Sequence, residues 1–142
     1  MRARIQANPE WLAIRLGPGK DVYQMLLAVA QQECIQAGTV VSAVGSLATA
    51  QLRFADQATA TTLTGRHEIL TLSGMLGQDG LHLHMTVADA QGSCSGGHLM
   101  PGCRIYTTLE LVIAILPGVR FARAVDPETG FRELQITQLY SS

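Results

Sequence analysis

The sequence is poor in charged and aromatic residues. Only 15% of its 142 residues are charged and only 5% are aromatic, whereas about 25% of an ordinary globular protein is charged. A chain that is 47% hydrophobic is neither a disordered segment nor a charge-rich coiled coil. A surface with so few charges leaves apolar atoms to be covered, and we therefore expect the chain to form an oligomer.

Long runs of basic residues are also absent. Ten Lys and Arg residues stand against eleven Asp and Glu residues, so the formal net charge is −1. Proteins that bind duplex DNA normally carry a basic stripe, because neutralising phosphates supplies most of their affinity. The few aromatic residues leave little for stacking on single-stranded bases. The composition therefore disfavours a nucleic-acid-binding protein.

The cysteines do not form a recognisable disulfide or zinc pattern. There are three of them, Cys34, Cys94 and Cys103, with no C-x-x-C spacing, which is typical of free thiols in a reducing compartment. The first twelve residues lack the continuous apolar stretch of a signal peptide, and no segment approaches the ~20 apolar residues that span a bilayer. We expect a cytoplasmic protein with no membrane partner, folded as a single domain over residues 1–142.

One helix is predicted, over about residues 20–37. Apolar residues recur there at helical spacing from Val22 to Ala30. Asp21 suits the positively polarised start of a helix, and Gly38 is a suitable residue just past its end. The wide apolar face predicts that this helix packs against a sheet.

Strand-like patterns, separated by turn signals, fill most of the remaining sequence. Strands are predicted at residues 11–16, 39–44, 47–54, 61–63, 68–76, 80–89, 103–116 and 132–140. One helix with seven or eight strands, mostly joined by short turns, indicates an α+β domain. Its sheet is expected to be mostly antiparallel, or to close partly into a barrel.

Three of the four histidines lie close together in the sequence. His82 and His84 are separated by one residue within a predicted strand, so their imidazoles project from the same face, about 6.5–7 Å apart at the backbone. Leu83 and Met85 point the other way, toward the core. The spacing allows two ring nitrogens to bind one ion at the usual ~2.0–2.1 Å.

His98 can join this pair across a predicted turn. Residues 89–92 have the composition of a tight turn, and the glycine pair 96–97 lets another backbone approach closely. Three imidazoles with one open position describe a reactive type of zinc or other divalent-metal site. The alternative is a polar strand face whose histidines point into water, and spacing by itself leaves both interpretations open.

The segment 65–103 closely resembles the plant-and-prokaryote-conserved (PPC) domain family. Its prokaryotic members show G-x-H-x-H, then D-x-x-G, then G-G-H-L-x-x-G-C, and this chain has GLHLH, DAQG and GGHLMPGC. Further matches cover almost the whole chain: LGPGKD at 16–21, AGTVVSAVGSL at 37–47, LR at 52–53 and YTTLE at 106–110.

This resemblance implies an α+β fold, a homotrimer and a divalent metal, with zinc as the expected ion. Carried over residue by residue, the metal ligands would be His82, His84 and His98. A binding or regulatory role is the first interpretation. The alternative is a metal-dependent enzyme of the lyase or hydrolase type, with a small oxygen-rich molecule as ligand at the open coordination position. A decarboxylase of small acetohydroxy acids in the wider fold group supports that alternative by fold-level analogy only.

The family label also implies DNA as a partner. Plant members join the domain to a basic AT-hook that binds the minor groove, but the Arg-Gly-Arg-Pro sequence is absent here. The net charge of −1 disfavours this partner further.

No catalytic residue is predicted firmly. Glu68 is the acid we expect nearest the metal, where it could bond a ligand imidazole or a metal-bound water; an ion pair with an arginine is the favoured alternative. Glu110, in an apolar strand, is also interpreted as an interface ion pair. His67 stands where the family usually has Phe, and we interpret it as a packing or interface residue rather than a ligand.

Overall fold

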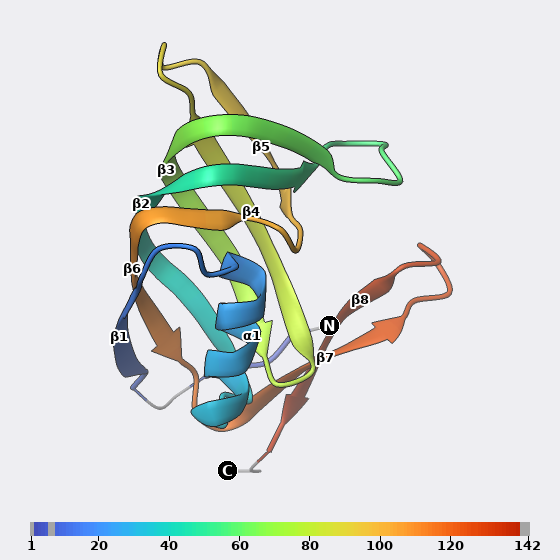
Figure 1. Cartoon of the computed structure of the whole chain (residues 1–142). Helices are drawn as coiled ribbons and strands as arrows, with labels where there is room; N and C mark the ends of the chain where they lie inside the picture. The colour runs from blue at the N-terminus through green and yellow to red at the C-terminus, as the bar shows by residue number, and fades with distance from the viewer. Residues whose placement is uncertain (1, 6–7, 140–142) are drawn as a thin grey trace.

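Figure 1 shows the computed structural model of the chain, which describes residues 2–5 and 8–139. It confirms the α+β fold with a mostly antiparallel sheet and one helix among the described residues. The last predicted strand ended at Tyr140, which lies outside the described residues. The elements are β1 (Glu10–Leu16), α1 (Val22–Gln32), β2 (Gly38–Arg53), β3 (Thr61–Gly77), β4 (Gly80–Ala88), β5 (Cys94–Leu99), β6 (Arg104–Ile115), β7 (Val119–Val125) and β8 (Arg132–Gln138).

The main sheet has six strands and closes partly on itself. The strand order is β1-β6-β2-β3-β4-β5, and β5 also pairs with β2, so β2 to β5 form a ring. The closing pairs are Leu52 with Leu99 and Arg53 with His98. Gly97 makes this closure possible, because a Cβ there would lie 2.7 Å from the Arg53 carbonyl oxygen. The predicted partly closed sheet is therefore observed.

Helix α1 packs across one face of this sheet (Figure 1), beside β3 and β4. Its buried residues are Val22, Leu26 and Ala30, which join the side chains lining the inside of the sheet in one hydrophobic core. With 11 residues, α1 is not long and apolar enough to cross a membrane, and the described residues contain no other helix.

Asp21 ties the start of α1 to the sheet. One oxygen of its carboxylate accepts a hydrogen bond from the Gln24 N–H, and the other accepts one from the Gly102 N–H at 2.6 Å. The helix therefore begins as predicted, with an acidic cap. The second bond connects this cap to the turn before β6.

The predicted helix end at residue 37 is wrong, because α1 ends at Gln32. Cys34 adopts a left-handed conformation with φ of 53°. The Cys34 N–H then donates to Gln31, and the Ile35 N–H donates to Ala30 at 2.8 Å. This is the Schellman arrangement, in which a left-handed residue usually filled by glycine ends the helix. The fully buried Ile35 supplies the apolar contact that fixes it, and Gly38 begins β2 instead.

Two predicted strand breaks are also wrong. Residues 39–44 and 47–54 form the single bent strand β2, and the two segments 61–63 and 68–76 form the single strand β3. Gly45 lies between the two predicted strands, but its missing side chain makes room for the Thr108 carbonyl oxygen of β6. Glycine marks a close approach of two backbones here rather than the end of a strand.

Strands β7 and β8 form a separate two-stranded hairpin that projects beside the main sheet (Figure 1). The sequence did not predict β7. The Phe121 N–H donates to the Gln36 carbonyl oxygen at 2.9 Å, which anchors the hairpin to the segment between α1 and β2. The hairpin thereby becomes a wall beside β4.

Candidate metal centre

The structure brings His82, His84 and His98 together. On β4, Leu83 and Met85 are 1% exposed and lie in the core, so the alternating histidines project from the opposite face. His98 on β5 lies directly opposite His84 in the antiparallel register. The turn at 89–92 sets this register, with the Asp89 carboxylate accepting hydrogen bonds from two N–H groups of the turn.

The three imidazoles form a compact triangle. Their ring centroids are 5.2, 5.0 and 5.6 Å apart, and one ring nitrogen from each lies within 4.8 Å of the others. Two nitrogens bound to one tetrahedral ion are roughly 3.3 Å apart. Small rotations of the side chains would therefore bring all three nitrogens to one divalent ion, and the donor set suits zinc.

The surroundings of His82 and His98 favour the neutral form of their imidazoles. Burial, together with the charges of His82 and Arg53, lowers the pKa of His98 to about 4. Burial also lowers the pKa of His82, with Arg123 as the next cause. A metal ion binds the neutral form of imidazole, because the protonated ring has no free lone pair. His82 and His98 can therefore receive a metal without first losing protons at neutral pH.

A pocket of about 550 Å³ opens beside His82 and His98. Two smaller hollows, of about 490 and 340 Å³, also reach the histidines, and all three are lined by His82. A small molecule could therefore approach an ion at this group from solvent, as an open coordination position requires.

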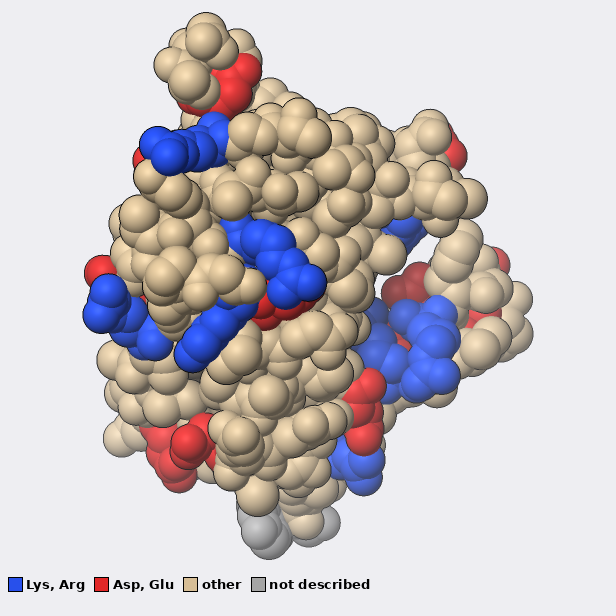
Figure 2. All heavy atoms as spheres, viewed as in Figure 1, with Lys and Arg blue, Asp and Glu red and all other residues tan. Residues whose placement is uncertain are grey.

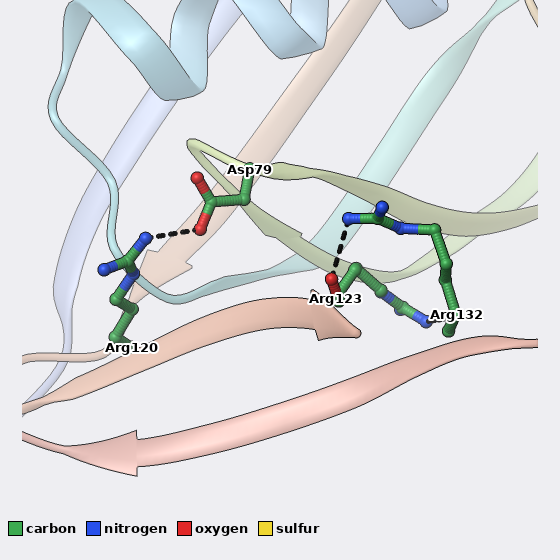
Figure 3. Close-up of polar contacts among 4 residues, drawn as sticks. All are labelled: Asp79, Arg120, Arg123 and Arg132. Atoms are coloured by element: carbon green, nitrogen blue, oxygen red, sulfur yellow. Dashed lines mark hydrogen bonds and ion pairs between the residues drawn. The ribbon is translucent and has the colours of Figure 1, made fainter. Parts of the chain in front are cut away.

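Charged side chains line the wall of the main pocket. The lining includes the arginines Arg53, Arg123 and Arg132 and the acids Asp79 and Glu133. Asp79 forms an ion pair with Arg120 at 2.6 Å, while Arg132 donates to the Arg123 carbonyl oxygen at 2.7 Å (Figure 3). This wall could not be predicted from the sequence, because three of its five charged residues come from the β7–β8 hairpin, whose position beside the histidines depends on distant contacts.

The acids and the fourth histidine named from the sequence lie elsewhere. Glu68 is exposed on β3, opposite Ala88, and the structure does not bring it to the histidine group. Glu110 is exposed on β6, opposite Arg15 of β1. His67 is buried, with its Nδ1 2.9 Å from the Gly65 carbonyl oxygen, and it does not belong to the histidine group.

A family model matches most of the chain. The model of the Plants and Prokaryotes Conserved (PCC) domain, the family also written PPC, matches residues 6–117. A curated relative, the bifunctional protein GlmU of a Synechococcus strain, is 57% identical over 123 residues, which is 87% of this chain and 20% of the relative. The chain thus spans about a fifth of the length of the curated relatives it matches.

Several solved structures share the fold over nearly the whole chain. A hypothetical protein from Salmonella enterica is 41% identical, with a TM-score of 0.91 over 95% of this chain and 99% of its own. The metal-containing protein AF0104 from Archaeoglobus fulgidus is 25% identical, with a TM-score of 0.82 over 95% and 99%. A Ralstonia eutropha protein with a provisional DNA-binding name is 27% identical, with a TM-score of 0.76 over 87% and 89%.

Proposed function

The chain belongs to the Plants and Prokaryotes Conserved (PCC) domain family, and from this premise we propose that it is a homotrimeric metal-binding protein with a binding or regulatory role. His82, His84 and His98 would hold the divalent ion, which we propose to be zinc. The observation that carries the proposal is the convergence of three imidazole nitrogens within 4.8 Å. The metal-containing name of the Archaeoglobus relative supports it.

Three histidines leave a zinc ion one coordination position for a ligand. When bound, such an ion supplies a Lewis acid that can hold or polarise an oxygen atom. The protein supplies fixed imidazoles on two paired strands, and a pocket that gives a small molecule access to them. These features favour reversible binding of a small molecule as the basic activity of the site.

An uncovered apolar face supports the homotrimer. On β1 and β2, the side chains of Trp11 and Val44 are 64% and 63% exposed. A shallow hollow across β1, β6 and β2 is lined mostly by uncharged residues. Covering such a face with a second copy removes apolar surface from water, which is the usual driving force of association.

A cytoplasmic location is proposed from the cysteines. Cys34, Cys94 and Cys103 are all free in the structure. Two of them are exposed, and exposed unpaired thiols are typical of a reducing compartment.

Catalysis is the second candidate function, and the position of Glu133 in the pocket favours it. This carboxylate lines the same pocket as His82 and His98, where it could move a proton to or from a bound molecule. A metal-dependent lyase or hydrolase acting on a small oxygen-rich molecule would need such a group. If Glu133→Gln loses turnover while its metal content is unchanged, Glu133 is identified as the group that transfers the proton.

DNA as a partner is favoured by the names of relatives such as the Ralstonia protein. The chain's formal charge of −1 and the placement of Arg53, Arg123 and Arg132 in a pocket wall favour a small ligand over a phosphate backbone. We therefore propose the small ligand as the physiological partner.

Metal analysis of the purified protein tests the proposal. We expect about one zinc per chain in the wild type, and a loss of most of it in His82→Ala and His98→Ala. The matched control is His67→Gln, which changes the histidine that lies outside the group and should leave the metal content unchanged. Equal metal content in all four proteins would overturn the proposal.

A further inference from the structure

We propose that the pocket beside the histidines binds a small oxyanion, a molecule with a carboxylate or phosphate group, through Arg53 and Arg123. The inference rests on the proposed function, because one oxygen of the ligand would occupy the open position of the metal. It adds the chemical class of the ligand and the residues that select it.

The pocket contains guanidinium groups that lack acidic partners. Among residues 2–5 and 8–139, the only ion pair within 4.0 Å is that of Arg120 with Asp79. Arg53 donates to the Gln57 carbonyl oxygen at 3.4 Å, and Arg123 donates to the Arg132 carbonyl oxygen at 3.4 Å. These long bonds to neutral acceptors leave both guanidinium groups able to bind an anion.

The charge of the pocket wall is positive. Arg120 offsets Asp79, and Glu133, which accepts a hydrogen bond from the Thr129 hydroxyl at 3.1 Å, offsets one of the three lining arginines. Two positive charges remain before any metal binds, and a divalent ion would add two more. A neutral ligand would leave this charge unbalanced, whereas an oxyanion compensates it in a partly enclosed space.

Partial burial strengthens this preference. Burial lowers the pKa of Arg123, although the neighbouring Glu133 raises it. The guanidinium has therefore lost part of its hydration, and an anion that enters the pocket restores the lost interactions with two N–H donors.

Arg53 and Arg123 approach the histidines from different elements. Arg53 ends β2 and pairs directly with His98 of β5, while Arg123 lies on β7 and lines the hollows on both sides of His82. Figure 2 shows basic side chains gathered where the β7–β8 hairpin meets the main sheet. A ligand in the pocket could therefore be held by guanidinium groups from two different strands.

The size of the pocket limits the ligand to a small molecule. About 550 Å³ is within the range of sites for metabolites and cofactors. The shared chemistry is a metal-binding oxygen close to an anionic group, which both 2-hydroxy acids and phosphate esters possess. The family model ends at residue 117, so Arg123 and the other hairpin residues lie beyond the matched region. The contribution of Arg123 to ligand choice would then come from outside the region that the family model matches.

The test is calorimetric titration of the zinc-loaded protein, with oxalate and methyl phosphate as separate probes. Metal content is measured first on every protein. We expect one probe molecule per chain, and an affinity at least tenfold lower in Arg53→Gln and in Arg123→Gln with zinc content unchanged. Arg53→Lys, which keeps the charge, should lose less. The control is Arg66→Gln, an exposed arginine on β3, and it should bind like the wild type.

The outcomes separate this proposal from the proposed function. If zinc loads but neither probe binds, or both bind Arg53→Gln and Arg123→Gln as tightly as the wild type, the oxyanion proposal is overturned while the metal site stands. If zinc does not load, the proposed function fails. The affinity of the metal-free protein for methyl phosphate then tests the two arginines. An equal affinity in the wild type, Arg53→Gln and Arg123→Gln overturns the proposal. Stronger binding of oxalate identifies an organic acid as the source, and stronger binding of methyl phosphate identifies a phosphate ester.

Discussion

His84 on β4 and His98 on β5 lie directly opposite each other, with their ring centroids 5.6 Å apart. This relationship depends on the register of a single hairpin. Because side chains alternate along a strand, a slip of one residue would turn His84 toward the core and Met85 toward the pocket. The turn at 89–92, held by the Asp89 carboxylate, and the buried Leu83 and Met85 fix the register. The residues that form the core on one face of β4 therefore also orient the histidines on the other face.

Zinc should stabilise the folded protein. A ligand that binds only the native state at 100 times its dissociation constant adds about 2.7 kcal/mol to the free energy of unfolding, which corresponds to a rise in Tm of roughly 5–10 °C for a chain of this length. Differential scanning fluorimetry would show this rise in the wild type and a much smaller one in His84→Ala. His84 is exposed, so the metal-free variant should melt near the metal-free wild type. An equal rise in both proteins would show that zinc binds elsewhere.

Much of this site could be predicted from local sequence. The alternation of His82, Leu83 and His84 fixes which side chains share a face, and the turn at 89–92 fixes where His98 falls. Both features depend on residues within about one hairpin. The grouping of the three histidines could therefore be predicted without knowing how distant parts of the chain pack.

The parts that could not be predicted depend on distant contacts. The end of α1 rests on Cys34 in a conformation that sequence patterns assign to glycine, and burial of Ile35 decides it. The arginine wall depends on the hairpin docking beside β4, through contacts such as that of Phe121 with Gln36. The sequence pattern within 119–138 does not indicate against which part of the fold that hairpin packs.

Replacing Cys34 by glycine should stabilise the protein. A non-glycine residue in the left-handed region costs about 1 kcal/mol, and glycine removes that cost but adds flexibility to the unfolded chain. We expect a net gain of roughly 0.5 kcal/mol in chemical denaturation. Cys34→Val, which is β-branched, should instead destabilise by about 1 kcal/mol or more. A destabilising glycine substitution together with a stabilising valine substitution would contradict the left-handed helix end.

The apolar face of β1 and β2 should hold the trimer together. Light scattering is expected to give about 46 kDa for the wild type, three times the 15.2 kDa of one chain. The double substitution Trp11→Asp and Val44→Asp places charges on that face and should yield single chains. Phe131→Ser, at an exposed position in the β7–β8 turn, serves as the control and should remain trimeric. A wild-type mass near that of one chain at micromolar concentration would refute the trimer.

Duplex DNA should bind weakly and without sequence preference, if at all. The chain has no excess of basic residues, so few counterions can be released on binding. Fluorescence anisotropy with a labelled duplex is expected to show no saturation at micromolar protein between 50 and 200 mM salt. Tight binding with a steep linear dependence on the logarithm of salt concentration would instead support DNA as the partner.

The most direct measurement is an anomalous difference map from crystals of the protein as purified, collected on both sides of the zinc absorption edge. The account predicts one strong peak per chain, present only above the edge, about 2.0–2.1 Å from a nitrogen of each of His82, His84 and His98. A map in which the three rings lie this close but enclose no anomalous peak, even after soaking in zinc, would contradict it.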